Sequence, residues 1–144
     1  MTYIEMGQGD SYYDRKVQPC ISDFMGQVFE AIVQEFMFFR NLKSRLPDHI
    51  IRQGRFWGSD PHRKKEVEID YLGITNSGYL LGEAKWTKAP VGESEVKLLK
   101  EKAELIPGQH YYYLFSKSGF KNKLIERHQN IELILFPEMV KEFL

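Results

Sequence analysis

The feature that most constrains this chain is a stretch of alternating residues from Glu66 to Trp86. Acidic and apolar residues alternate from Glu66 to Tyr71, and Leu-Gly-Ile-Thr continues the stretch to Thr75. An Asn-Ser-Gly run follows, and a second apolar stretch begins at Tyr79. Alternation with a period of two is typical of a half-buried strand, and the Asn-Ser-Gly run favours a turn. The stretch therefore predicts a β-hairpin with strands over Glu66–Thr75 and Tyr79–Trp86.

The hairpin is expected to bring two acidic residues together. Side chains alternate along a strand, so Glu68 and Asp70 share one face of the first strand. Glu83 and Lys85 share one face of the second. A two-residue loop and a four-residue loop both set Asp70 opposite Glu83, whereas a three-residue loop does not. The same register sets Glu68 opposite Lys85 and adds Leu72 to the acidic face, so that face is not plainly a solvated one.

An opposed pair of carboxylates needs neutralising. Their Cβ atoms would lie about 4.5–5.5 Å apart, where like charges destabilise a sheet. A shared proton or a bound cation such as Mg²⁺ or Mn²⁺ would remove the repulsion, and an adjacent lysine would stabilise charge on a phosphate. The alternative is a solvated sheet face with a Glu68–Lys85 ion pair, which explains the same residues.

The rest of the chain predicts alternating strands and helices. Apolar residues at helical spacing predict a buried helix over residues 21–39. Further strands are expected over His49–Trp57, His110–Phe115 and Ile131–Phe136, and further helices over 93–106, 120–128 and Glu138–Leu144. This order indicates an α/β fold with a mixed central sheet flanked by helices. Residues 1–20 are interpreted as an N-terminal arm or linker remnant, and 21–144 as one domain.

Composition excludes several classes of protein. The 144 residues contain 20 basic and 20 acidic side chains, so a nucleic-acid site has to be a local patch. The single cysteine, Cys20, excludes an intrachain disulfide and a Cys-rich zinc site. No apolar run approaches the roughly 18 residues of a membrane helix, and no signal peptide is evident, so we expect a cytoplasmic protein without a membrane partner.

One stretch, from Arg40 to Lys65, is strongly basic, with eight basic and two acidic residues. It is interpreted either as a nucleic-acid-binding surface or as a solvated loop. The candidate nucleic-acid-binding residues are Arg52, Arg55, Arg63, Lys64 and Lys65, extended by Lys117 and Lys121. Trp57 and Trp86 could stack on bases, although packing at sheet ends is the favoured interpretation. The lysines of the 93–106 helix, Lys102 among them, are interpreted as surface ion pairs.

These residues resemble a known motif. Asp70, followed thirteen residues later by Glu83-Ala84-Lys85, resembles the PD-(D/E)xK motif of the restriction-endonuclease-like superfamily, although no proline precedes Asp70. The predicted α-β-β-β-α-β order is similar to its core, and the segment ending at Glu30 resembles the helix that supplies a further acid. More narrowly, Glu-Ile-Asp at 68–70, Gly-Glu-Ala-Lys-Trp at 82–86 and Phe-Ser-Lys-Ser-Gly-Phe at 115–120 resemble domain of unknown function 234, found C-terminal to archaeal-type AAA ATPases.

The resemblance implies a Mg²⁺-dependent (or Mn²⁺-dependent) nuclease that hydrolyses DNA, as the C-terminal domain of an archaeal-type ATPase or its partner. Asp70, Glu83 and the Ala84 carbonyl would hold the metal, Glu30 would be an accessory ligand, and Lys85 would orient the attacking water. The alternatives are a non-catalytic nucleic-acid-binding or ATPase-docking module of the same fold, and a pure interaction domain. A homodimer is expected by analogy with nucleases that need two sites for two strands.

Overall fold

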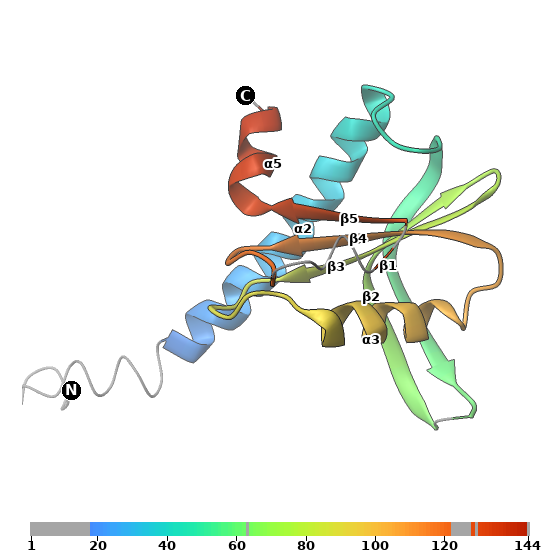
Figure 1. The fold of residues 1–144 in the computed structure, drawn as a ribbon, viewed down its shortest axis with the longest axis horizontal. Helices are drawn as coiled ribbons and strands as arrows, with labels where there is room; N and C mark the ends of the chain where they lie inside the picture. The colour runs from blue at the N-terminus through green and yellow to red at the C-terminus, as the bar shows by residue number, and fades with distance from the viewer. Residues whose placement is uncertain (1–17, 63, 122–127, 129, 144) are drawn as a thin grey trace, which may run out of the picture.

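The computed structural model describes residues 18–62, 64–121, 128 and 130–143. The helices are α2 (Gln18–Leu42), α3 (Glu93–Ala103) and α5 (Phe136–Phe143); the strands are β1 (Ile50–Asp60), β2 (Lys65–Thr75), β3 (Gly78–Lys85), β4 (Gln109–Ser116) and β5 (Ile131–Leu135). The strands form one sheet in the order β1-β2-β3-β4-β5 (Figure 1). The β1–β2 and β2–β3 pairs are antiparallel and the β3–β4 and β4–β5 pairs are parallel.

This arrangement confirms the predicted α/β fold, with its mixed sheet and the α-β-β-β-α-β order of the restriction-endonuclease-like core. Phe136 belongs to α5 rather than to the preceding strand, because the chain turns directly from β5 into the helix. Most of the predicted arm (residues 1–17) and of the predicted helix over 120–128 (residues 122–127) lie outside the described residues. Within the described ranges, every helix is too short or too polar to cross a membrane.

The hairpin forms in the predicted register. Ile74 pairs with Tyr79, and the ladder continues from there toward Gly82. The Thr75 hydroxyl closes the turn, because it accepts a hydrogen bond from the Gly78 N–H and donates one to the Gly78 carbonyl, both at 3.0 Å. Gly78 has no room for a side chain, since a Cβ there would lie 2.2 Å from the carbonyl oxygen of Gln109 on β4.

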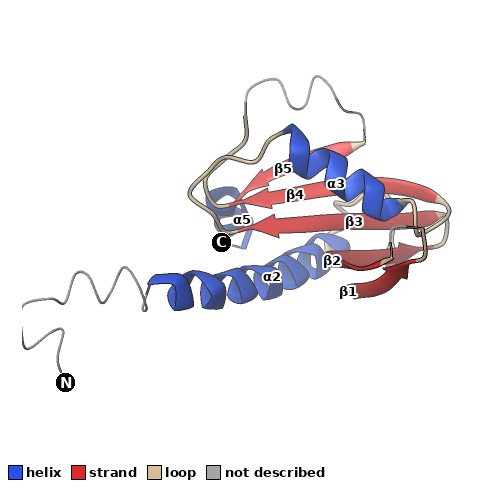
Figure 2. Ribbon diagram, turned by 90° about the horizontal axis from the view of Figure 1, so that it is seen from below, coloured by secondary structure: helices blue, strands red, loops and turns tan. Residues whose placement is uncertain are grey.

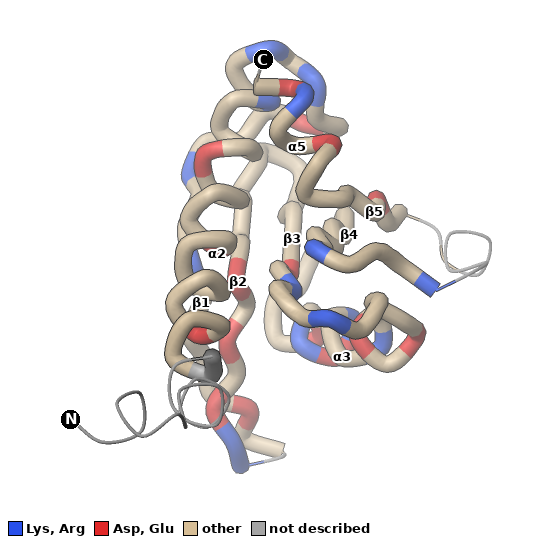
Figure 3. The backbone as a smooth tube through the Cα atoms, turned by 90° about the vertical axis from the view of Figure 1, so that its left-hand side faces the viewer, with Lys and Arg blue, Asp and Glu red and all other residues tan. Residues whose placement is uncertain are grey.

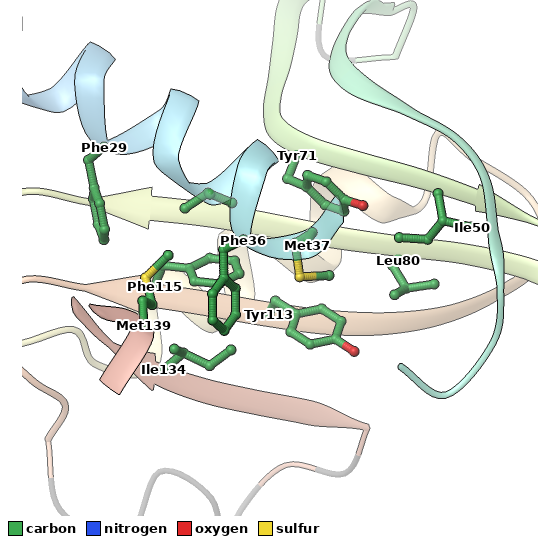
Figure 4. Packing of buried hydrophobic residues seen from close by; sticks show 11 residues of the cluster. Phe29, Phe36, Met37, Ile50, Tyr71, Leu80, Tyr113, Phe115, Ile134 and Met139 are labelled. Carbon is green, nitrogen blue, oxygen red and sulfur yellow. The ribbon is translucent and has the colours of Figure 1, made fainter. Parts of the chain in front are cut away.

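Helices cover both faces of the sheet (Figure 2). One apolar cluster lies on each face. On the α2 face, aromatic and aliphatic side chains from the helix meet those of the central strands and α5 (Figure 4). Phe36 lies at the middle of this cluster, with its ring 6.1 Å from that of Phe115 and 5.9 Å from that of Phe143. On the α3 face, Val96, Leu99 and other buried residues of the helix pack on the opposite side of the sheet. The site therefore rests on a sheet that is fixed from both sides.

We predict that Phe36→Ala destabilises the domain by about 3–5 kcal/mol, because it removes a fully buried ring and leaves a cavity. Urea denaturation measures the change. Phe38→Ala on the same helix is the matched control: Phe38 is 51% exposed, so its loss is expected to cost less than about 0.5 kcal/mol. Equal losses for the two variants would contradict the packing described for α2.

Candidate functional site

The sheet divides at the position of the predicted acidic residues. Within the described residues, pairing between β2 and β3 ends at Tyr71 and Gly82. From there β2 continues beside β1, whereas β3 continues beside β4 (Figure 1). Asp70 and Glu83 are the next residues on their strands, so they occupy the two sides of the fork. The predicted register is confirmed down to this point, and the expected backbone pairing of Asp70 with Glu83 is replaced by a gap.

The Asp70 carboxylate bridges this gap. Its Oδ2 accepts a hydrogen bond from the Ala84 N–H at 2.9 Å. In an unbroken ladder the backbone of the neighbouring strand would supply the partner for such an edge group. Here a side chain takes that place, and it holds the Asp70 carboxylate against β3 directly after Glu83.

A β-bulge in β2 places Asp70 at the fork. The register of β1 against β2 shifts between Gly54 and Phe56, where β2 carries one extra residue. Asp70 and Tyr71 therefore lie together opposite the single Arg55. Bulges of this kind redirect side chains and increase the local twist, which is how β2 leaves the plane of β3.

The bulge also changes which residues share a face. Ile69 and Leu72 are three residues apart, yet both pack in the α3-side cluster with Leu81. Tyr71 packs in the α2-side cluster, and Asp70 lines a pocket on that same side. The expectation that Leu72 lies on the face of Asp70 is therefore wrong, because the extra residue reverses the alternation.

A glutamine on α2 supports the bulge. The Gln34 Nε2 donates hydrogen bonds to the carbonyl oxygens of Gly54 at 3.2 Å and of Asp70 at 3.1 Å. Gln53 in turn donates to the Gln34 carbonyl at 2.8 Å and accepts a bond from the Tyr71 hydroxyl at 3.0 Å. These bonds satisfy backbone groups at the irregular segment and anchor the helix to the strand that carries Asp70.

Carboxyl groups from α2, β2 and β3 meet at the fork. Figure 3 marks the acidic positions along the backbone of these three elements in red. Burial and the neighbouring Asp70 carboxylate raise the pKa of Glu30, on α2, against the opposing charge of Arg55. Burial and contact with Asp70 raise the pKa of Glu83 to about 8, against the opposing charge of Lys102. Because Glu83 is only 5% exposed, water does little to screen this repulsion. The cluster favours a bound proton or a cation.

The ammonium group that touches the cluster is not the predicted one. Lys102 Nζ on α3 lies 2.7 Å from Glu83 Oε1, and its side chain is 19% exposed. The interpretation of Lys102 as a surface ion pair is therefore wrong. The charge of Lys85 acts on Glu95 of α3, where it contributes to lowering the pKa of that carboxyl. The pKa of Glu95 is lowered despite partial burial, chiefly because its carboxylate accepts a hydrogen bond from the Gly92 N–H.

Arg55 neutralises the other side of the cluster. Its guanidinium lies 2.9 Å from Glu68 Oε2 and 3.8 Å from Glu30 Oε2. The alternative of a Glu68–Lys85 ion pair is wrong, because the fork separates the two strands below the last paired residues and Glu68 turns to Arg55. Arg55 is thus part of the acidic site rather than a free cation on a basic surface.

The other predicted nucleic-acid-binding residues are spread over the molecule. Arg52 is exposed on β1, Lys64 and Lys65 are exposed at the end of the β1–β2 hairpin, and Arg63 lies outside the described residues. Lys117 and Lys121 are exposed after β4, where their N–H groups donate to the carbonyls of Lys85 and Val91. Lys117 and Lys121 therefore lie next to the segment that follows Lys85. Arg52, Lys64 and Lys65 lie apart from them, on β1 and at the end of the β1–β2 hairpin.

The two tryptophans have different surroundings. Trp86 packs with Phe29 and Phe136 at ring separations of 5.2 and 5.4 Å, and Lys117 Nζ lies 5.0 Å from its ring centre. Packing at a sheet end is confirmed for Trp86. The same interpretation is wrong for Trp57, a residue on β1 that is 61% exposed.

Sequence reasoning missed two contributors to the site, Lys102 and Gln34. Lys102 follows the buried Leu99 by three residues, so a helical wheel of α3 places it beside the buried stripe, and this signal was available. Gln34 carries no comparable signal, because its role depends on backbone carbonyls that a bulge exposes. As placed, no three His, Cys, Asp or Glu side chains among the described residues form a group that could hold a metal ion.

Comparison with known proteins assigns a family. The model of DUF234, archaea bacterial proteins of unknown function, matches residues 1–104, so the chain belongs to this family. An uncharacterized protein of Methanocaldococcus jannaschii, MJECL04, is 28% identical over 119 residues. That alignment covers 80% of this chain and 25% of MJECL04, so the chain spans about a quarter of the length of this curated relative.

Two solved structures are similar. The protein of unknown function AF1548 is 13% identical at a TM-score of 0.53, over 78% of this chain and 66% of that one, which indicates a shared fold. The DNA modification-dependent restriction endonuclease AspBHI is 17% identical at a TM-score of 0.42, over 91% of this chain and 31% of that one. A score this low does not support an argument about function.

We predict that Glu83→Gln stabilises the metal-free protein increasingly as the pH rises. The folded state keeps the Glu83 proton up to about pH 8, whereas the ordinary pKa is 4.5. The folded wild type therefore binds more protons in this window, and its free energy of unfolding falls as the pH rises through it. Glutamine cannot ionise and avoids that loss.

Urea denaturation in EDTA at several pH values measures this margin. Glu101→Gln, at an exposed position on α3, is the matched control and is expected to show no margin that grows with pH. A constant difference between Glu83→Gln and the wild type would contradict the description of Glu83 as a buried acid beside Asp70.

Proposed function

We propose that this chain is a metal-dependent nuclease that hydrolyses DNA phosphodiester bonds, acting as the C-terminal domain of an archaeal-type ATPase or as its partner. The observation that carries the proposal is the fork, where carboxyl groups of Glu30, Asp70 and Glu83 meet beside the ammonium group of Lys102. Membership of the DUF234 family and a relative about four times as long as the matched region are consistent with a module of a larger protein.

The chemistry of the donors, rather than their placement in the structure, fits a hard divalent cation. Carboxylate oxygens are the ligands that Mg²⁺ prefers, and Mg²⁺ often uses one or two of them together with water and phosphate oxygens. The raised pKa values of Glu30 and Glu83 indicate an excess of buried negative charge that such a cation would neutralise. Asp70, Glu83 and the Ala84 carbonyl would hold the ion, with Glu30 as an accessory ligand.

A bound divalent ion would supply positive charge at the phosphate and lower the pKa of a water molecule. The residues of the chain would do the rest. The Ala84 N–H holds the Asp70 carboxylate, which would in turn keep the ion between β2 and β3 where the two strands separate. Lys85 would orient the attacking water and stabilise charge on the phosphate oxygens. Lys102 is a positioning residue, because its Nζ lies 2.7 Å from Glu83 Oε1 and would hold that carboxylate once Glu83 is ionised.

A second candidate is a non-catalytic nucleic-acid-binding or ATPase-docking module. The observation that favours it is that protein cations already match two of the acids, since Lys102 pairs with Glu83 and Arg55 with Glu30. In such a module the cluster would be a structural element. Salt-dependent DNA binding without cleavage, unchanged in Asp70→Asn, would favour this candidate.

We also propose that the chain forms a homodimer, whichever function it has. Sedimentation velocity measures its oligomeric state.

We predict that purified protein nicks plasmid DNA in Mg²⁺ or Mn²⁺, and that Asp70→Asn, Glu83→Gln and Lys85→Ala each lower the rate by about 10²–10³. Each change removes a charge aimed at the reacting phosphate or its metal. Glu66→Gln, at an exposed position on the same strand as Asp70, is the control and is expected to keep wild-type activity. Cleavage that persists in Asp70→Asn would overturn the assignment.

We further predict that Mn²⁺ raises the melting temperature of the wild type and not that of Asp70→Asn, because a ligand that binds only the folded state stabilises it. Differential scanning fluorimetry with and without EDTA measures this shift independently of catalysis. Equal shifts in both proteins would place the bound ion elsewhere.

A further inference from the structure

We propose that Trp57 and Arg55 form a stacking platform for an unpaired nucleobase at the edge of the acidic fork, so that the substrate is single-stranded or locally unpaired nucleic acid. This inference rests on the proposed function and names the form of substrate that the same site takes. It assigns a role to the side chain that the catalytic proposal leaves unused.

Trp57 is large, aromatic and accessible. The residue is 61% exposed on β1, whereas Trp86 packs among other rings. Single exposed apolar residues are common on protein surfaces, so exposure alone does not mark a site. Trp57 differs because an oriented cation accompanies it: the guanidinium carbon of Arg55 lies 5.5 Å from the centre of the indole ring.

Arg55 is held in place from its other side. Its guanidinium pairs with Glu68 at 2.9 Å and with Glu30 at 3.8 Å. These contacts restrict the normally flexible Arg55 side chain before a ligand binds. Binding beside the indole therefore does not incur the entropic cost of ordering the guanidinium. The same contacts connect the platform to the site, because Glu30 also contacts Asp70.

A pocket of about 490 Å³ lies next to this platform. Residues of α2, β1 and β2 line it, among them Glu30, Arg55 and Asp70. A strand whose backbone reached the acidic fork through this pocket would have Trp57 at its margin. An aromatic ring there can stack on any base, since every base has a π-face, and the neighbouring guanidinium adds a cation–π contribution.

The platform favours an unpaired base over a duplex. Bases inside a duplex are stacked on one another, and their faces become available only when the strand is single or when a nucleotide leaves the stack. The chain also has a formal net charge of zero, so electrostatic attraction to the phosphates of a duplex contributes little to its affinity. Stacking on an aromatic ring does not require a net positive charge, so this protein can use it.

The test uses binding in EDTA, which separates recognition from hydrolysis. Trp86→Phe leaves Trp57 as the single tryptophan, because the chain contains two. We expect its fluorescence to be quenched by a thymidine oligonucleotide and not by a blunt duplex of the same length. By fluorescence anisotropy, Trp57→Ala is expected to lower affinity for the single strand about 5- to 100-fold, and Trp57→Phe to keep most of it.

Phe38→Ala is the control, since Phe38 is also exposed but lies on α2 outside the residues that line the pocket. Unchanged affinity in Trp57→Ala, or equal quenching by the duplex, would overturn the platform. Stacking without cleavage in Mg²⁺ would support the platform and overturn the nuclease proposal. Cleavage of DNA that is indifferent to Trp57→Ala would support the nuclease and overturn the platform.

Discussion

The hydrogen bond from the Ala84 N–H to the Asp70 carboxylate is the interaction on which the site depends. A sheet that separates into two ribbons exposes backbone groups that need partners, and an unmatched buried group of this kind is costly. Asp70 supplies one such partner with its side chain. The same carboxylate thereby joins the two ribbons and becomes the centre of the acidic cluster, so structure and proposed chemistry use one group.

The cluster carries a cost in stability that the rest of the fold has to offset. Glu83 is almost completely buried beside another carboxyl group, and Lys102 compensates it only in part. Two apolar clusters, one under each helix layer, provide the stabilisation against which this repulsion is tolerated. Sites that need strained or unfavourable arrangements typically depend on such support from their surroundings.

The fold could be predicted from the sequence because its signals are local. The alternation in 66–86 and the turn before Gly78 determine the hairpin and its register, and helical spacing identifies α2 and α3. The bulge at Asp70 could not be predicted, because one extra residue in β2 leaves no mark in an alternating pattern. The partners of Glu83 and Glu68 were likewise missed, since both depend on how far the strands diverge.

The division of the sheet has a mechanical consequence. Beyond the last β2–β3 pair, Tyr71 with Gly82, the β1–β2 ribbon and the β3–β4–β5 ribbon are no longer hydrogen-bonded to each other. Asp70 lies on the first ribbon and Glu83 on the second. A ligand that spans Asp70 and Glu83 would act as a tie between the ribbons. Ligand binding at the fork would then oppose local opening of the hairpin. Slower amide exchange in β2 would therefore report a bound ligand.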